Sequence, residues 1–171
     1  QYKVIAMPAA AEYAPQTMEK LEAYARNGGT VIADGGVWFG EASGGVRFAQ
    51  PEKKLVFVDS GNRLSCLDTD YYEPQLVTAQ ELLYCYEKNY YYEGEKHISY
   101  VSNQVGKGQI ASLCFDLGNV YSDNITYALR QFVKALFAAC GYVPFISVEG
   151  SDYADVTLMK KDDKIMVNII N

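Results

Sequence analysis

The stretch that decides the fold runs from Tyr2 to Gly36 and reads YKVIAMPAAAEYAPQTMEKLEAYARNGGTVIADGG. It begins with an apolar run at residues 4–7 and ends on a second apolar run at residues 31–33. Between them lies an amphipathic segment, whose apolar residues at helical spacing are Met18, Leu21 and Ala25. The stretch therefore predicts a strand, a helix and a second strand.

The two apolar runs show no alternation of polar and apolar residues, which is typical of parallel strands covered on both faces. A right-handed crossover between them would place the helix on one face of the sheet. In such sheets, ligands usually bind beyond the carboxyl ends of the strands. The segments to inspect are therefore Pro8–Tyr13 and Asp34–Glu41.

Composition limits the classes of protein that this chain can represent. With 171 residues and 49% hydrophobic residues, it is long enough for one domain with a core and a small appendage. The formal net charge of -6 argues against binding to nucleic acid or to an anionic membrane, because both need clustered Lys and Arg. No apolar run approaches the roughly 20 residues that cross a bilayer.

The metal-binding and redox residues are few and scattered. The cysteines form no CxxC pair, which favours free thiols over a disulfide or a metal site; they are Cys66, Cys85, Cys114 and Cys140. Free thiols favour a soluble, cytoplasmic protein slightly. His97 is the single histidine and there is no D-x-D-x-D loop, so we predict no metal site and no cofactor.

From residue 35 to residue 92 the sequence gives a mixture of loop and strand signals. A glycine-rich loop at residues 35–45 contains Trp38 and Phe39, and residues 55–58 predict a short strand. Between Leu64 and Tyr92 the pattern is weak, and residues 82–86 suit either a strand or a helical turn. Tyrosines are frequent here, at 71–72 and 90–92, and exposed tyrosines suit interfaces and sugar stacking as well as packing on an edge strand.

The C-terminal half is clearer. Residues 98–102 and 109–115 predict two strands, joined at 106–108 by a glycine turn. Ser122 or Asp123 suits the start of a long amphipathic helix that ends near Cys140. A β-hairpin turning at Asp162–Asp163 follows beyond Pro144. The chain opens directly on a strand and stops at the end of another, which favours a piece of a longer protein.

Several segments in order resemble a known family. They are YKVIAMP, MEKLEAYARNGGTVIADG, HISYVSNQVGKGQIASLCFDLG, LRQFVKALFAACGYVP and DVTLMKKDDKIMVNIIN. The succession is similar to the middle region of glycoside hydrolase family 42 β-galactosidases, in which a trimerisation domain and a small β domain follow a catalytic barrel. The match is poor over residues 46–96, and its motifs are structural rather than catalytic.

The resemblance implies a fold and a domain division. It implies an α/β domain with a three-layer, flavodoxin-like or class I glutamine amidotransferase-like sheet, mostly parallel with an antiparallel hairpin. That domain would span residues 1–143, and residues 144–171 would begin a following β domain. The partner would be the catalytic barrel of the same parent chain, and the parent would be a homo-oligomer.

The resemblance also implies that this segment is not catalytic. In the family the catalytic glutamates belong to the barrel, and in related amidotransferases a nucleophilic cysteine lies at a strand-to-helix turn. Here that turn is Asp34-Gly35-Gly36 and has no cysteine, whereas Cys114 has the neighbours of a thiol within a strand. We therefore expect a non-catalytic accessory domain of a glycoside hydrolase.

Two alternatives depend on a few residues. Asp34 and Asp116 follow predicted strands and would converge at one end of the sheet, where they would act either as loop caps or as the carboxylates of a small stand-alone hydrolase. A carbohydrate-binding module would instead use aromatic platforms, with a sugar as partner. The candidate ligand or interface residues are Asp34, Trp38, Phe39, Asp116 and Tyr121.

Overall fold

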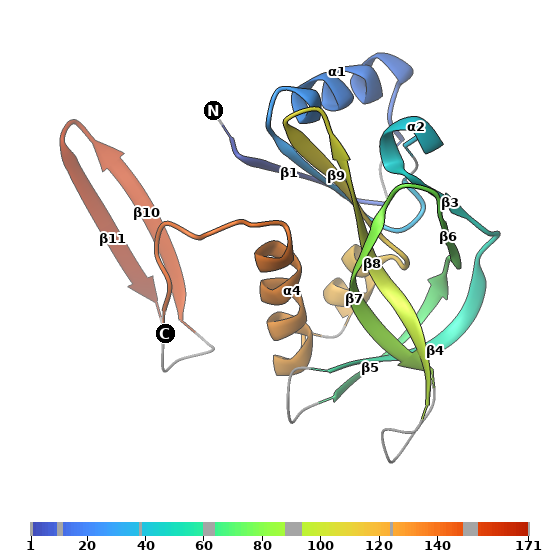
Figure 1. The fold of residues 1–171 in the computed structure, drawn as a ribbon. Coiled ribbons are helices and arrows are strands. Elements are labelled where there is room, and N and C mark those ends of the chain that lie inside the picture. The colour runs from blue at the N-terminus through green and yellow to red at the C-terminus, as the bar shows by residue number, and fades with distance from the viewer. Residues whose placement is uncertain are drawn as a thin grey trace.

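In the computed structural model of the chain, the described residues are 2–9, 12–37, 39–59, 64–87, 94–123, 125–148 and 154–170. This part of the chain is built around a curled sheet of seven strands, with helices against both of its faces (Figure 1). A separate β-hairpin lies at the C-terminal end.

The predicted strand–helix–strand unit is confirmed. Strand β1 (Val4–Met7) pairs in parallel with β2 (Thr30–Ala33), and helix α1 (Pro15–Arg26) connects them. Proline occupies the first turn of α1, where its missing N–H costs no hydrogen bond. Gly28, with φ of 106°, lets the chain turn back towards β2 after the helix ends.

Strand β2 is covered on both faces, as the absence of alternation predicts. Val31 belongs to an apolar cluster that includes Ala25 of α1, whereas the next residue, Ile32, belongs to the main core with Leu136 of α4 (Tyr127–Ala139). All four residues of β2 are buried. The chain is therefore an α/β domain with helices on opposite faces of the sheet.

The expectation of a mostly parallel sheet is wrong. After β2 come helix α2 (Glu41–Gly44) and the strands β3 (Val46–Phe48), β4 (Glu52–Asp59), β5 (Leu64–Tyr71), β6 (Pro74–Leu76), β7 (Gln80–Glu87), β8 (Glu95–Val105) and β9 (Gly108–Leu113). The order of the main sheet is β1-β2-β9-β8-β7-β4-β5, and β3 pairs with β6 in a small antiparallel sheet. Among the described strands of this sheet, β1, β2 and β9 alone pair in parallel. The β8–β9 hairpin reverses the chain direction, and the pairs from β9 to β5 are antiparallel.

The segment that the sequence left undecided is a strand. Residues 82–86 lie within β7, whose register against β8 shifts between Glu81 and Leu83 and again between Leu83 and Tyr84. Such irregularities change which side chains face the core, so the apolar residues of β7 do not alternate. The same sheet confirms the predicted hairpin of β8 and β9, with Gly106 at φ of 62° in its turn.

The helix expected to start at Ser122 or Asp123 and to end near Cys140 starts later, at Tyr127, and a short helix that was not expected precedes it. Ser122 and Asp123 lie at the end of α3 (Leu117–Asp123), and Thr126 is the residue that caps α4. The Thr126 hydroxyl accepts a hydrogen bond from the N–H of Leu129 at 3.2 Å, which satisfies one free donor of the first turn. No helix in the described part of the chain is both long and apolar enough to cross a bilayer.

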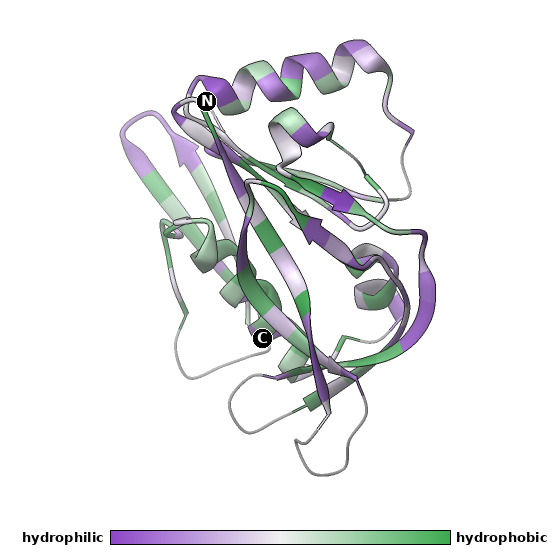
Figure 2. Cartoon of the chain, turned by 45° about the vertical axis from the view of Figure 1, so that its right-hand side comes forward, coloured by the Kyte–Doolittle hydropathy of each residue, from purple (hydrophilic) through white to green (hydrophobic). Residues whose placement is uncertain are grey.

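The C-terminal hairpin confirms the predicted turn and stands apart from the main body (Figure 1). Strands β10 (Asp155–Lys161) and β11 (Lys164–Ile170) pair antiparallel, and Asp162 takes the left-handed conformation at the turn. Green, hydrophobic stretches run along this hairpin in Figure 2. Its exposed large apolar side chains are Leu158, Met159, Ile165, Met166, Val167, Ile169 and Ile170.

Candidate functional site

An apolar cleft of about 390 Å³ lies where the sequence led us to look, at the carboxyl ends of β1 and β2. It lies between these strands and the helices α3 and α4. Its lining includes Met7, Pro8, Asp34, Leu117, Tyr121 and Phe137. Two of the five candidate residues, Asp34 and Tyr121, therefore meet in one cleft.

Asp34 is held by backbone N–H groups. Its side chain is buried, and Oδ1 accepts hydrogen bonds from the N–H of Gly35 at 3.0 Å and of Leu117 at 2.8 Å. Oδ2 accepts a hydrogen bond from the N–H of Gly118 at 2.9 Å. Burial raises the pKa of Asp34, although the three backbone hydrogen bonds act in the opposite direction. Both oxygens are thus engaged in fixing the start of α3.

Asp116 also caps α3. Its Oδ1 accepts a hydrogen bond from the N–H of Asn119 at 3.0 Å, and its Oδ2 accepts one from the Asn119 side-chain amide. The two aspartates converge as predicted, and the charge of Asp116 contributes to the raised pKa of Asp34. A retaining glycosidase needs two carboxylates that flank a sugar. Here the carboxylates bind peptide N–H groups instead, which favours the interpretation as caps.

The aromatic candidates have different environments. Phe39 is 7% exposed and packs in the apolar cluster that includes Met7 and Val37, so its ring is a core element and offers no stacking surface. Tyr121 is half-buried and lines the cleft. Trp38 and the tyrosines at 90–92 lie outside the described residues.

The thiols do not form a nucleophilic site in the described part of the chain. Burial raises the pKa of Cys85 to about 12 and that of Cys114 well above its usual value, so neither is a thiolate at neutral pH. His97 Nε2 lies 2.9 Å from Glu87 Oε2 and forms a hydrogen bond with that carboxylate. Cys66 is the one exposed thiol, and it too is free.

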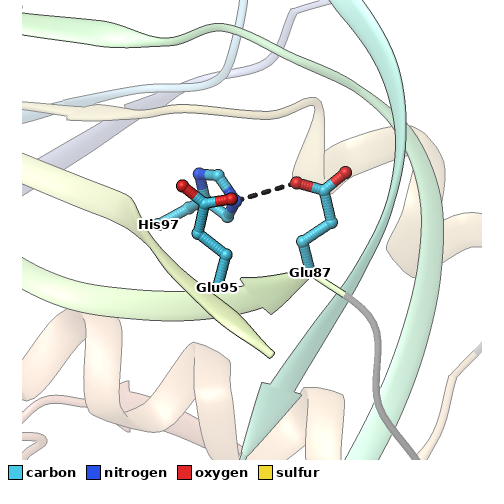
Figure 3. Close-up of side chains that lie close together, drawn as sticks. All are labelled: Glu87, Glu95 and His97. Carbon is cyan, nitrogen blue, oxygen red and sulfur yellow. Dashed lines mark hydrogen bonds and ion pairs between the residues drawn. The ribbon is translucent and has the colours of Figure 1, made fainter. Parts of the chain in front are cut away.

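The structure gathers a second cluster that sequence spacing did not reveal. Glu87, Glu95 and His97 come together at the ends of β7 and β8, and one ligand atom of each lies within 4.8 Å of the others (Figure 3). Lys54 of the neighbouring strand β4 places its Nζ 3.1 Å from Glu87 Oε2. The signal in the sequence is a pair of glutamates eight positions apart, which becomes informative only when the hairpin register is known.

Comparison of sequences gives no relative: no protein-family model matches the chain, and no curated protein matches its sequence. Comparison of structures does find similar proteins. Gan42B, a GH42 β-galactosidase from G. stearothermophilus, has a TM-score of 0.68 at 18% identity, over 98% of this chain and 26% of its own. The β-galactosidase from Rahnella sp. R3 has a TM-score of 0.69 at 15% identity, over 99% of this chain and 27% of its own.

A further structure with a similar fold belongs to a differently named enzyme. The exo-β-1,4-mannosidase Op5Man5 from Opitutaceae bacterium strain TAV5 has a TM-score of 0.59 at 14% identity, over 78% of this chain and 25% of its own. The chain therefore spans about a quarter of the length of these enzymes. The resemblance in sequence is matched by a resemblance in structure: the chain has the fold of one segment of the GH42 β-galactosidases.

Proposed function

We propose that this chain is a non-catalytic accessory domain of a larger glycoside hydrolase of the β-galactosidase type, active in carbohydrate metabolism. The observation that carries the proposal is the match of nearly the whole chain to only about a quarter of each β-galactosidase. A segment of that size within a longer enzyme has neighbours on the same chain. In this proposal the neighbour is a catalytic barrel, and the domain takes the place of the trimerisation domain in a homo-oligomer.

The hydrogen bonds made by the Asp34 and Asp116 carboxylates support a non-catalytic role. A general acid and a nucleophile must both reach the substrate. Asp34 instead accepts three backbone hydrogen bonds, and Asp116 accepts two from Asn119. The apolar lining of the cleft beside Asp34 favours contact with apolar protein surface over contact with a sugar.

The C-terminal hairpin supports the proposed division into residues 1–143 and a β domain that begins at residue 144. Side chains alternate between faces along a strand, so Met166 and Ile170 project on one face of β11, and Ile165, Val167 and Ile169 project on the other. All five are exposed in this chain. A strand that is apolar on both faces is typical of a sheet covered on both sides. Further strands of the parent chain are the occupants that we propose.

Hydrolysis of a chromogenic β-galactoside by the purified chain tests the non-catalytic part of the proposal. We expect no release of chromophore above the buffer blank, whereas a β-galactosidase assayed in parallel is active. Hydrolysis that disappears in Asp34→Asn or Asp116→Asn would overturn the proposal in favour of a small stand-alone hydrolase.

A further inference from the structure

The hairpin of β7 and β8 concentrates acidic oxygens around a buried imidazole. Glu87 and Glu95 are direct partners in the register of the two strands, and His97 follows Glu95 by two residues and so projects from the same face. His97 is only 8% exposed, and its Nε2 lies 2.9 Å from Glu87 Oε2. Figure 3 shows Glu95 and His97 side by side on this face, with the Glu87 carboxylate opposite them.

Two features of this cluster go beyond what the fold needs. Like charges placed directly opposite each other across a hairpin destabilise it, and Glu87 and Glu95 are such a pair. In addition, the carboxylate of Glu73 lies 3.8 Å from His97 Nδ1, on the other side of the ring. The 2.9 Å contact with the Glu87 carboxylate is a hydrogen bond that Nε2 donates, so an ion bound at Nε2 would take the place of that proton and the ring would carry its proton on Nδ1, on the side of Glu73. A carboxylate behind a histidine is the usual outer partner of a metal-binding imidazole.

We infer that Glu87, Glu95 and His97 bind a divalent transition-metal ion of the Zn²⁺ type. The ligand set is one imidazole nitrogen and two carboxylate oxygens, which suits Zn²⁺ and leaves a position for water or another ligand. A magnesium or calcium ion takes oxygen ligands and would not use the imidazole. The ion joins the ends of β7 and β8 and offsets the repulsion between the two glutamates.

Lys54 alone does not neutralise the negative charge of this cluster. Its ammonium group contacts Glu87 at 3.1 Å, and it neutralises one carboxylate of the cluster. The remaining charges, those of Glu95 and of the nearby Glu73, still make the cluster negative when His97 is neutral. The site therefore attracts a cation even with Lys54 in place.

The test is a calorimetric titration of the whole chain with ZnCl₂, together with thermal unfolding in the presence and absence of the ion. We expect a single ion per chain and a higher Tm with Zn²⁺, because an ion that binds only the folded state stabilises it. Glu95→Gln removes an exposed ligand without disturbing the core, and it should weaken the affinity at least about tenfold. Glu73→Gln should weaken it by about tenfold through the outer partner of His97.

Two matched variants make the result specific. Glu81→Gln removes the same charge from an exposed position of β7 away from the cluster, and Cys66→Ser removes the exposed thiol. Both should bind Zn²⁺ as the unmodified chain does, and CaCl₂ should give no comparable heat. The inference is overturned if the unmodified chain does not bind Zn²⁺, if Glu95→Gln binds it with unchanged affinity, or if Cys66→Ser abolishes binding.

Discussion

Replacing Asp34 by alanine should destabilise the fold far more than any surface change near the cleft. The carboxylate accepts hydrogen bonds from the N–H groups of Leu117 and Gly118, at 2.8 and 2.9 Å, and these groups have no partner of their own within the first turn of α3. A hydrogen bond to a charged group contributes about 1.5–3 kcal/mol, and loss of a cap costs about 0.5–2 kcal/mol. Water in the adjacent cleft would form hydrogen bonds with the freed N–H groups and so offset part of this loss.

We therefore expect Asp34→Ala to lower the free energy of unfolding by about 2–4 kcal/mol, out of a total of about 5–15 kcal/mol for a domain. Urea unfolding followed by far-ultraviolet circular dichroism measures the difference. Asp116→Ala is the matched control, because it removes a carboxylate from the same helix start at a more exposed position, where a cap contributes about 1 kcal/mol. A cost for Asp34→Ala no larger than that of Asp116→Ala would refute the interpretation of Asp34 as the principal cap of α3.

Three further predictions concern the core and its titration. Gly108→Ala should cost about 3 kcal/mol or more by urea unfolding, because a Cβ there would overlap the carbonyl oxygens of Ala25 in α1 and of Gly29 after it. Gly40→Ala meets no atom within 4 Å and should change little, and equal costs for the two variants would contradict this packing. Tyr100→Phe should cost about 1 kcal/mol in the same assay, because it removes the buried contact of 2.6 Å between the Tyr100 hydroxyl and Cys140 Sγ; an unchanged midpoint would argue against that hydrogen bond. The raised pKa of Asp34 means that the folded state holds its proton to higher pH than the unfolded state does, so the free energy of unfolding should fall as pH rises from the ordinary value of 3.8 through the folded pKa. Asp34→Asn should flatten this slope, and an equally steep slope in the variant would assign it to other groups.

The N-terminal half of the fold could be predicted because local pattern and tertiary structure agree there. Consecutive residues Val31 and Ile32 enter different apolar clusters, so a strand buried on both faces shows itself as an uninterrupted apolar run. The amphipathic segment before it has few apolar residues, and they fit a helix lying on one face. The extrapolation to a mostly parallel sheet failed because local pattern does not determine the partners of later strands.

The middle of the chain could not be predicted for reasons that the structure identifies. In β7 the register shifts around Leu83 break the two-residue period that marks a strand. The boundary of α4 was missed because Asp123 is a good cap in isolation, and the choice of Thr126 depends on a hydrogen bond to Ser65, 61 residues away. The cluster of Glu87, Glu95 and His97 likewise exists only through the pairing of two strands.

The most direct test of the proposed accessory role is to read the genomic DNA on both sides of the segment that encodes this chain. The account predicts one continuous reading frame that encodes a (β/α)8-type barrel upstream, with glutamates after its strands, and further β-strands downstream. A start codon directly before Gln1 and a stop codon directly after Asn171 would contradict it, and the cleft beside Asp34 would then have to be examined as a site in its own right.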